Sequence, residues 1–310
     1  MKRLLVILVT TWAAAILMGG CIRDNTDHCN NVIVNFSYTA DDGQEHLTEY
    51  IGSIDLYVFD EEGTHIMTVG YGGTDLHSSG GSASFRLQEG RYALYAVGNP
   101  LEKTLVFGLN TGDPERMFIA SPESARGGTV HGQDHNYLGS ASLEISDSRY
   151  TSRSTVRMYS AHIDVSVEVT GLHARLGTRA AGDYTLSISE SNSKVDFNNR
   201  VAYGELHECY PEMEYDAETG KWLSRNLALF RMDNGEDIEE ALCNHVLKMT
   251  DGDGNVVIEK SILEYLAENA GKIDLTRQEA LLPIEVNFSE VAVTVTPPQW
   301  YLEDVTTEWE

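Results

Sequence analysis

A cysteine placed for lipid attachment is the clearest chemical signal in this chain. Lys2 and Arg3 form a basic start, Leu4–Met18 is an apolar run, and two glycines ending at Gly20 come directly before Cys21. This is the order of an export signal, and the cysteine after the small pair predicts cleavage after Gly20 and acylation of the Cys21 thiol. The alternative is an ordinary secretory signal in which Cys21 is left free or removed. A membrane-spanning helix is disfavoured, because the apolar run is shorter than the ~20 residues that a span needs.

The other cysteines can form a disulfide. If Cys21 carries lipid, three cysteines remain, and we expect Cys29 to be the unpaired one. Cys209 and Cys243 lie in the same later region, and an exported protein meets an oxidising compartment, so they are the candidate pair. Sequence does not supply the geometry that a disulfide requires. A bonded pair and two free thiols therefore both stay open.

Two polar segments have residue types that bind metal ions. His131, Asp134 and His135 offer three ligands in one short stretch. Histidines four apart converge only on a helix, and this glycine-containing stretch is not helical, so a polar loop without a metal is the preferred interpretation. Asp251–Asn255 resembles the start of a calcium loop, but Ile262 stands where the bidentate glutamate belongs, and a hairpin turn is preferred. We find no catalytic constellation and expect no enzyme activity, metal or cofactor.

Strand signals dominate the elements that must position these groups. Turn-forming clusters separate short segments of alternating apolar and polar residues, which predicts an all-β chain of antiparallel β-sandwiches. The strand segments are Val32–Tyr38, Ile54–Phe59, Ser82–Leu87, Tyr92–Val97, Ile163–Val169, Tyr184–Ser189, Val246–Thr250, Val256–Ile258, Ile284–Phe288 and Val291–Val295. One helix is expected over residues 259–270, with Gly271 as its C-terminal glycine.

The chain divides into four parts. We expect a lipoprotein signal peptide at residues 1–20, a lipidated linker at 21–31, and β-sandwich domains at 32–150 and 155–310, the first ending in a loop-rich zone from Asn110 to Asn136. The composition gives 22 Lys and Arg against 48 Asp and Glu, a net charge of −26. A surface this acidic repels both nucleic acid and anionic bilayers. Lipid must therefore hold the protein at its membrane.

Several short segments, spread over the whole chain, match one known family in order and spacing. They are Cys21 with Asp24 and Cys29, Ile54–Gly63, Glu89–Asn99, Tyr137–Gly139, Arg157 before Ile163–Val167, and Ile262–Leu266. In these segments the chain resembles the FimB-type fimbrial anchor lipoproteins, accessory subunits of type V pili. Pro297–Trp300 matches the family's glycine–tryptophan ending only loosely, which leaves the course of the last strand open.

The resemblance implies a structural protein rather than a catalyst. It implies two transthyretin-like β-sandwich domains, a lipid-anchored position at the outer membrane, and a fimbrial stalk subunit as partner, with no small-molecule substrate. We expect the protein to be exposed at the cell surface, although sequence leaves the periplasmic and exterior faces both open. Such a protein ties the pilus base to the membrane and limits pilus length. The alternative is a surface glycan-binding lipoprotein, which would expose an aromatic platform on its loops.

The C-terminal segment is the expected contact with the pilus. Pro297 and Pro298 cannot lie inside a central strand, so they separate the strand Val291–Thr296 from Gln299–Glu310. The apolar residues of that last piece are Trp300, Leu302 and Val305. An extended tail of this kind can add as a strand to another subunit. The alternatives are a tail that packs on its own domain or is disordered.

The first strand is expected to stay in place. Related stalk fimbrillins lose theirs to a trypsin-like cut, but no Lys or Arg occurs between Arg23 and Arg86. With Val32–Tyr38 retained, the protein can donate a strand but cannot accept one. It would therefore terminate a polymer on one side.

Overall fold

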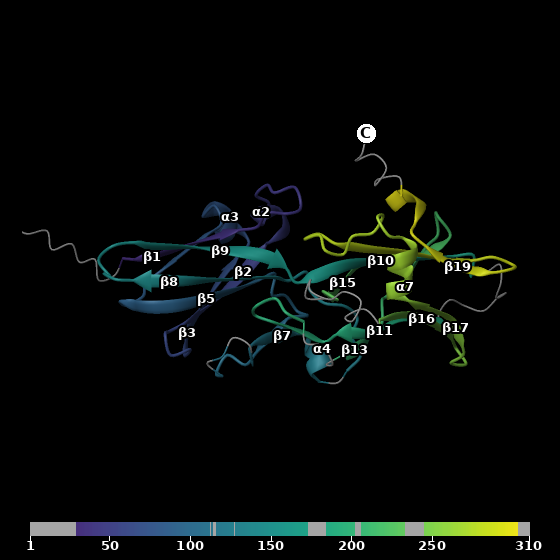
Figure 1. Ribbon diagram of the computed structural model, residues 1–310, viewed down its shortest axis with the longest axis horizontal. Helices are drawn as coiled ribbons and strands as arrows, with labels where there is room; N and C mark the ends of the chain where they lie inside the picture. Colours follow the sequence, from purple (N-terminus) through teal and green to yellow (C-terminus); the bar gives the residue numbers. More distant parts are fainter. Residues whose placement is uncertain are drawn as a thin grey trace, which may run out of the picture.

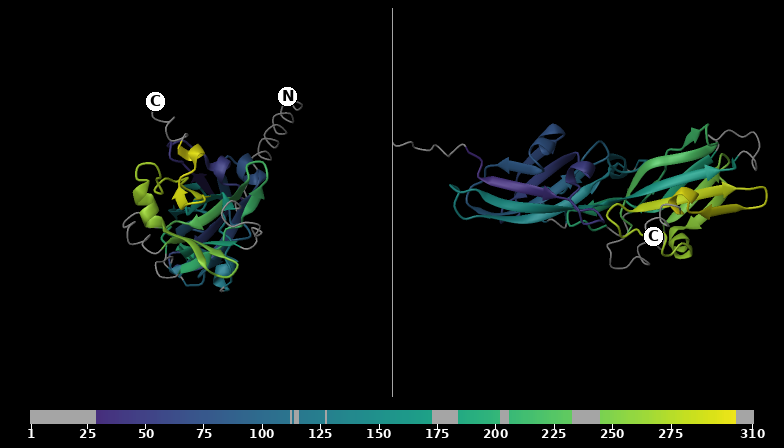
Figure 2. Two further views of the ribbon diagram at one scale, coloured as in Figure 1. Left: turned by 90° about the vertical axis from the view of Figure 1, so that its right-hand side faces the viewer. Right: turned by 90° about the horizontal axis from the view of Figure 1, so that it is seen from above.

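The computed structural model describes residues 29–111, 113, 116–126, 128–172, 184–201, 206–232 and 245–302. These residues form two lobes joined end to end (Figure 1; Figure 2, right). Strand β9 (Ser152–Ser160) of the first lobe runs on into β10 (His162–Thr170) of the second through the single residue Ala161. The fold is mostly β, as predicted. Among the described residues, no helix is long and apolar enough to cross a membrane.

The first lobe is built from one seven-stranded sheet in the order β3-β2-β5-β8-β9-β1-β4. Besides β9, its strands are β1 (Val32–Ser37), β2 (Ser53–Phe59), β3 (His65–Gly72), β4 (Ser82–Phe85), β5 (Gly90–Gly98) and β8 (Tyr137–Ile145). Two helices of four and five residues, α2 (Leu47–Tyr50) and α3 (Thr74–Ser78), interrupt the strands. The alternation along β1 buries Val32, Val34 and Phe36 in the core of this lobe, as the period of two requires.

This sheet curls until its two edges meet. Tyr71 on β3 donates its hydroxyl to the carbonyl of Ser84 on β4 at 3.4 Å and accepts from the Ser84 amide at 3.2 Å. The first lobe is therefore a near-closed barrel-like sheet rather than the expected two-layered antiparallel sandwich. The physical reason is β1, which pairs antiparallel with β4 and parallel with β9 and so joins the two layers into one.

The second lobe has two facing sheets. One has the order β14-β15-β10-β18-β19 and the other β13-β11-β16-β17. The strands besides β10 are β11 (Tyr184–Asn192), β13 (Leu206–Cys209), β14 (Glu214–Asp216), β15 (Lys221–Phe230), β16 (Val246–Asp251), β17 (Val256–Ser261), β18 (Leu281–Phe288) and β19 (Val293–Thr296). A continuous apolar core lies between them, including Ile163, Val165 and Val167 of β10. The β10–β18 pair is parallel, so this lobe also departs from a purely antiparallel arrangement.

A third, small sheet lies beside the junction of the lobes. It has the order β12-β7-β6, from β6 (Leu105–Phe107), β7 (Phe118–Ala120) and β12 (Lys194–Asp196), so it pairs segments from both halves of the chain. Ile119 and Phe197 from this region pack against Tyr57 of the first lobe and Phe230 of the second. The stretch 110–136 therefore contains β7 and the four-residue helix α4 (Pro122–Ala125) rather than loops alone.

Two local predictions from the second half of the chain are confirmed in outline. Asp251–Asn255 is the turn of the β16–β17 hairpin, where Asp251 Oδ1 accepts from the amides of Asp253 and Asn255 at 3.0 and 2.8 Å. Helix α7 (Ile262–Glu268) is shorter than the predicted 259–270 because β17 extends to Ser261. Ser261 then caps the helix by accepting from the Glu264 amide at 3.4 Å.

Candidate functional site

The chain enters the first lobe at the pole farthest from the second lobe. Asn31 is buried there, and its amide group donates to the carbonyls of Leu87 at 3.0 Å and Ser148 at 3.2 Å. Its Oδ1 accepts from the Leu87 amide at 3.0 Å. Gly20 and Cys21, the predicted cleavage and lipidation residues, lie outside the described residues. The predicted linker therefore ends where Asn31 fixes the chain to the folded lobe.

Strand β1 lies in the interior of its sheet. It pairs with β4 on one side and β9 on the other, over residues 32–35 and 32–37 respectively. Because β1 and β9 are parallel and β9 leads into the second lobe, β1 starts at the outer pole and runs toward the junction. Removing β1 would break hydrogen bonds to both neighbours, so this strand is an integral part of the barrel-like sheet.

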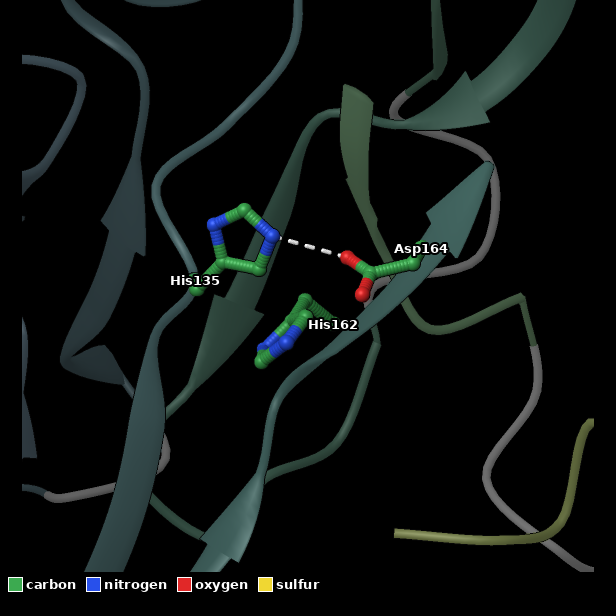
Figure 3. A group of neighbouring side chains, drawn as sticks. All are labelled: His135, His162 and Asp164. Atoms are coloured by element: carbon green, nitrogen blue, oxygen red, sulfur yellow. Dashed lines mark ion pairs between the residues drawn. The ribbon is translucent and has the colours of Figure 1, made fainter. Parts of the chain in front are cut away.

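A cluster of His135, His162 and Asp164 lies at the junction of the lobes (Figure 3). His135 comes from the segment before β8, and the other two residues are alternate positions on β10. His135 Nε2 lies 2.8 Å from Asp164 Oδ1, and both side chains are half exposed. The rings of His135 and His162 meet edge to face with centroids 4.8 Å apart. The cluster therefore brings two imidazoles and a carboxylate together from both lobes.

Hydrogen bonds to the backbone position the two histidines. Asn99, in a left-handed conformation with φ of 50°, donates its side-chain amide to the carbonyl of His135 at 3.1 Å. His162 is buried, and its Nδ1 lies 3.0 Å from the carbonyl oxygen of Asn136. Tyr137 packs edge to face on the His162 ring at 5.2 Å. Asn99 thus fixes the backbone at His135, while Asn136 and Tyr137 hold the ring of His162 in place.

The pKa values of the two imidazoles are shifted in opposite directions. Burial lowers the pKa of His162 to about 4, so its ring is neutral at pH 7. The neighbouring Asp164 carboxylate raises the pKa of His135 above its usual value. The cluster therefore places His135 Nε2 and Asp164 Oδ1 at 2.8 Å beside the buried imidazole of His162. Neutral imidazole and carboxylate are the forms in which these groups bind metals.

The structure does not bring together the three residues that the sequence singled out. Asp134 Oδ2 accepts from the amides of Leu101 and Lys103 at 3.1 and 2.9 Å and so shapes a loop. His131 Nδ1 lies 2.9 Å from the carbonyl oxygen of Tyr210. Only His135 joins a cluster. Sequence reasoning missed its partners, although the alternation of His162-Ile-Asp164 already put both on one face of a strand.

A second set of polar contacts ties the lobes together next to this cluster. Glu279, just before β18, accepts hydrogen bonds from the hydroxyls of Tyr38 and Tyr137, the latter at 3.1 Å. Burial raises the pKa of Glu279. Asp41 accepts from the amides of Gln278 and Glu279 at 2.7 and 3.2 Å. The lobes are therefore joined by specific hydrogen bonds as well as by the covalent link.

The predicted donor segment begins on its own lobe. Residues 299–302 are helical rather than extended, since a turn after Pro298 forms in which its carbonyl accepts from the Leu302 amide at 3.3 Å. Trp300 Nε1 donates to Glu168 Oε1 at 2.7 Å. The Tyr301 hydroxyl donates to the carbonyl of Lys272 at 2.7 Å. Leu302 is half-buried, and Val305 lies outside the described residues.

The second lobe has two open strand edges that face each other. β17 and β19 are terminal strands of their sheets. A groove of about 490 Å³ lies between them, lined by residues 257–260 and 293–296 with Glu268 of α7. Edge strands present backbone groups that can pair with another strand. The first lobe, whose edges meet at Tyr71 and Ser84, has no comparable opening among its described strands.

Two further expectations from the sequence concern a disulfide and an aromatic platform for glycans. Cys209 is buried on β13, and burial raises the pKa of its thiol to about 12. Cys243 lies outside the described residues, so the disulfide stays a prediction. Among the described residues, the exposed large aromatics are Tyr50 on α2, Tyr150 between β8 and β9, Tyr159 on β9, Tyr215 on β14 and Trp300 after β19. Of these, Tyr150 alone lies in a loop, whereas a glycan binder is expected to carry its aromatic platform on loops.

One comparison with known proteins identifies a family. A family model described as fimbrillin-A associated anchor proteins Mfa1 and Mfa2 matches residues 26–306. A search of curated proteins gives no match.

Solved structures share the fold at low sequence identity. The fimbrial anchor protein Mfa2 from Porphyromonas gingivalis has a TM-score of 0.60 and 14% identity, covering 85% of this chain and 94% of that one. A candidate polysaccharide-binding protein from Bacteroides thetaiotaomicron has a TM-score of 0.64 and 16% identity, with coverage of 86% and 98%. A candidate adhesin from Bacteroides ovatus has a TM-score of 0.64 and 13% identity, with coverage of 87% and 94%.

Proposed function

This chain belongs to the family of fimbrillin-A associated anchor proteins, and from that membership we propose that it fixes the base of a type V fimbria to the outer membrane. The observation that carries the proposal is that the chain entry and the open strand edges lie on different lobes. The chain enters at the outer pole of the first lobe, where Asn31 fixes it. The open strand edges lie on the other lobe. A membrane attachment and a subunit contact are thereby kept apart.

The membrane attachment in this proposal is lipid on Cys21. Its support is the export signal before it and the short distance, ten residues, to Asn31. Each buried CH₂ of an acyl chain contributes ~0.8 kcal/mol, so two or more chains hold a protein at a bilayer without help from its acidic surface. The first lobe would then stand next to the membrane and the second lobe away from it.

Cys29 provides a matched control for this attachment. Cys21→Ala should move the protein from the membrane fraction to the soluble fraction, whereas Cys29→Ala should leave it with the membrane, since Cys29 is exposed but does not follow the small pair. Fractionation followed by immunoblotting measures both. Membrane association of the Cys21→Ala protein at the level of the parent would refute the lipid attachment.

The fimbrial contact in this proposal is strand exchange at the second lobe, with the segment 299–310 as donor to a stalk subunit. With β1 paired on both sides, the first lobe has no vacated strand position to offer. The donor must first leave its own lobe. That release breaks the Trp300–Glu168 and Tyr301–Lys272 hydrogen bonds, which a new strand pairing with many backbone hydrogen bonds would replace.

Deletion of residues 299–310 tests the donor assignment. The shortened protein should remain folded and membrane-bound, because both sheets of the second lobe are complete at Thr296. Cells that produce it should shed their fimbriae or carry longer ones, as counted by electron microscopy. Normal attachment and length would rule out the segment as the contact while leaving the lipid attachment untouched.

We also propose that the two lobes are separate domains, divided at Ala161 rather than near residues 150–155. The support is that β9 pairs with β1 and β8 in the sheet of the first lobe. Limited trypsin digestion should therefore cut at the exposed Arg149 before Arg153 and Arg157, which lie within β9. Cleavage within β9 before Arg149 would contradict this division.

A further inference from the structure

The geometry points to a binding site for a divalent transition-metal ion, Zn²⁺ being the best fit, formed by His135, His162 and Asp164 at the junction of the lobes (Figure 3). One ligand atom from each residue lies within 4.8 Å of those of the other two. Two ligands come from alternate positions of β10 and the third from the segment before β8. The inference is independent of the anchoring function proposed above.

The first support is the orientation of His162. All of its side-chain hydrogen bonds to described residues are made by Nδ1, which lies 3.0 Å from the Asn136 carbonyl oxygen and 3.2 Å from Ser160 Oγ. An N–H at Nδ1 donating to a backbone carbonyl leaves the lone pair of Nε2 for a metal. Histidine ligands in proteins are typically fixed in this way by their second nitrogen. Burial and packing against Tyr137 hold the ring in that orientation.

The second support is an unsatisfied carboxylate oxygen. Asp164 Oδ1 is buried and receives no hydrogen bond of ordinary geometry, although His135 Nε2 approaches it to 2.8 Å. A buried anionic oxygen without an aligned donor is costly. A cation bound to both atoms from one side would satisfy the oxygen, and the close approach shows that the two atoms can serve as neighbouring ligands of one ion.

The donor types select the metal. Two imidazoles with one carboxylate suit zinc and its neighbours in the transition series, whereas Ca²⁺ and Mg²⁺ prefer oxygen ligands throughout. Bonds of about 2.0–2.2 Å place tetrahedral zinc ligands about 3.4 Å apart. His135 Nε2 and Asp164 Oδ1, now 2.8 Å apart, would move apart by about 0.6 Å to reach that spacing. His135 and Asp164 are half exposed, so they can turn toward the fixed His162 ring, and water completes the coordination.

Such an ion would connect the two lobes. His135 is held by the first lobe through Asn99, while His162 and Asp164 belong to β10 of the second. Because the ligands come from both lobes, a bound metal ion would resist separation of the lobes. Binding should therefore raise the melting temperature of the whole chain, since a ligand that binds only the folded form stabilises it.

The test is a zinc titration of the full chain without a polyhistidine tag, by isothermal calorimetry at pH 7.5. We expect one Zn²⁺ per chain, and a loss of affinity of at least about tenfold in His135→Gln and in Asp164→Asn. The matched control is His46→Gln, since His46 also lies against a carboxylate, Asp42, at 2.9 Å, but outside the cluster. Circular dichroism verifies folding of each variant.

The outcomes separate the site from non-specific binding. The site is supported if His46→Gln binds zinc with the affinity and stoichiometry of the parent while the two cluster variants lose binding. X-ray absorption that shows two imidazole ligands on the bound zinc supports it as well. No saturable binding, an equal loss in His46→Gln, or full competition by Ca²⁺ would overturn it. The half-exposed His135 and Asp164 are the variants used because substitution of the buried His162 is expected to disturb folding.

Discussion

Gly139 lies where β8 and β9 approach too closely for any side chain, and Gly139→Ala is therefore expected to destabilise the first lobe. An added Cβ would lie 2.3 Å from the carbonyl oxygen of Arg157, 2.8 Å from Val156 Cγ1 and 2.9 Å from Met158 Sδ. The first distance is about 1 Å shorter than ordinary van der Waals contact. The obstructing atom is backbone of a strand paired on both sides, so it cannot turn away.

The expected loss in the free energy of unfolding follows from overpacking in a closed sheet. Overpacking of this kind costs about 1–3 kcal/mol, and a backbone obstruction places Gly139→Ala at the upper end. Replacing glycine by alanine restricts the unfolded chain and offsets about 0.4–1 kcal/mol of that cost. We therefore expect the free energy of unfolding to fall by about 2 kcal/mol, with the loss located in the first lobe.

Gly72→Ala is the matched control. Gly72 lies on the exposed edge strand β3, and its added Cβ would meet only Ser53 Cβ at 3.9 Å. Urea unfolding followed by circular dichroism compares the two variants with the parent. The reasoning is refuted if the stability of Gly139→Ala lies within about 0.5 kcal/mol of that of Gly72→Ala, because the steric argument predicts a far larger difference.

Three further predictions concern the second half of the chain. Trp300→Phe removes the donor to Glu168 and should lower the free energy of unfolding by about 1 kcal/mol in urea titrations; no change would contradict this. Burial lowers the pKa of His207 to about 4. The unfolded state thus binds more protons between about pH 6.5 and 4, and stability falls as pH falls. His207→Gln should flatten that slope in acid titrations, and an unchanged slope would count against it. Peptide mapping by mass spectrometry should find a Cys209–Cys243 disulfide, worth about 3–4 kcal/mol; free thiols at both positions would exclude it.

Local pattern determined much of the secondary structure. The alternation in Val32–Tyr38 and Ile163–Val169 became β1 and β10, with the apolar residues facing their cores. Asp251–Asn255 formed the predicted hairpin turn, and Ser261 began the one predicted helix. These features depend on neighbours within a few residues, so composition and spacing specify them. Family resemblance, carried by short segments such as Tyr137–Gly139, was confirmed by the match over residues 26–306.

The physical basis of two of those segments became visible only in three dimensions. Gly139 is required by the close approach of β9, the strand that pairs directly with β8 and places Met158 opposite Gly139. Asn99 takes a left-handed conformation and bonds the Gly52 amide at 2.8 Å and the His135 carbonyl at 3.1 Å. Neither contact can be derived from the segments themselves.

Which strands lie side by side was decided by tertiary structure. A period of two tells which face of a strand is buried but not which strand is its neighbour. The parallel pairs β1–β9 and β10–β18 join segments more than 100 residues apart. The first of these pairs, in the first lobe, turns the expected sandwich into a near-closed sheet. The antiparallel β8–β9 pairing, in which Tyr137 is opposite Ser160, brings His135 against His162 and Asp164 of β10. The amino-acid types determine the chemistry of each side chain, whereas strand pairing at the junction of the lobes creates the cluster.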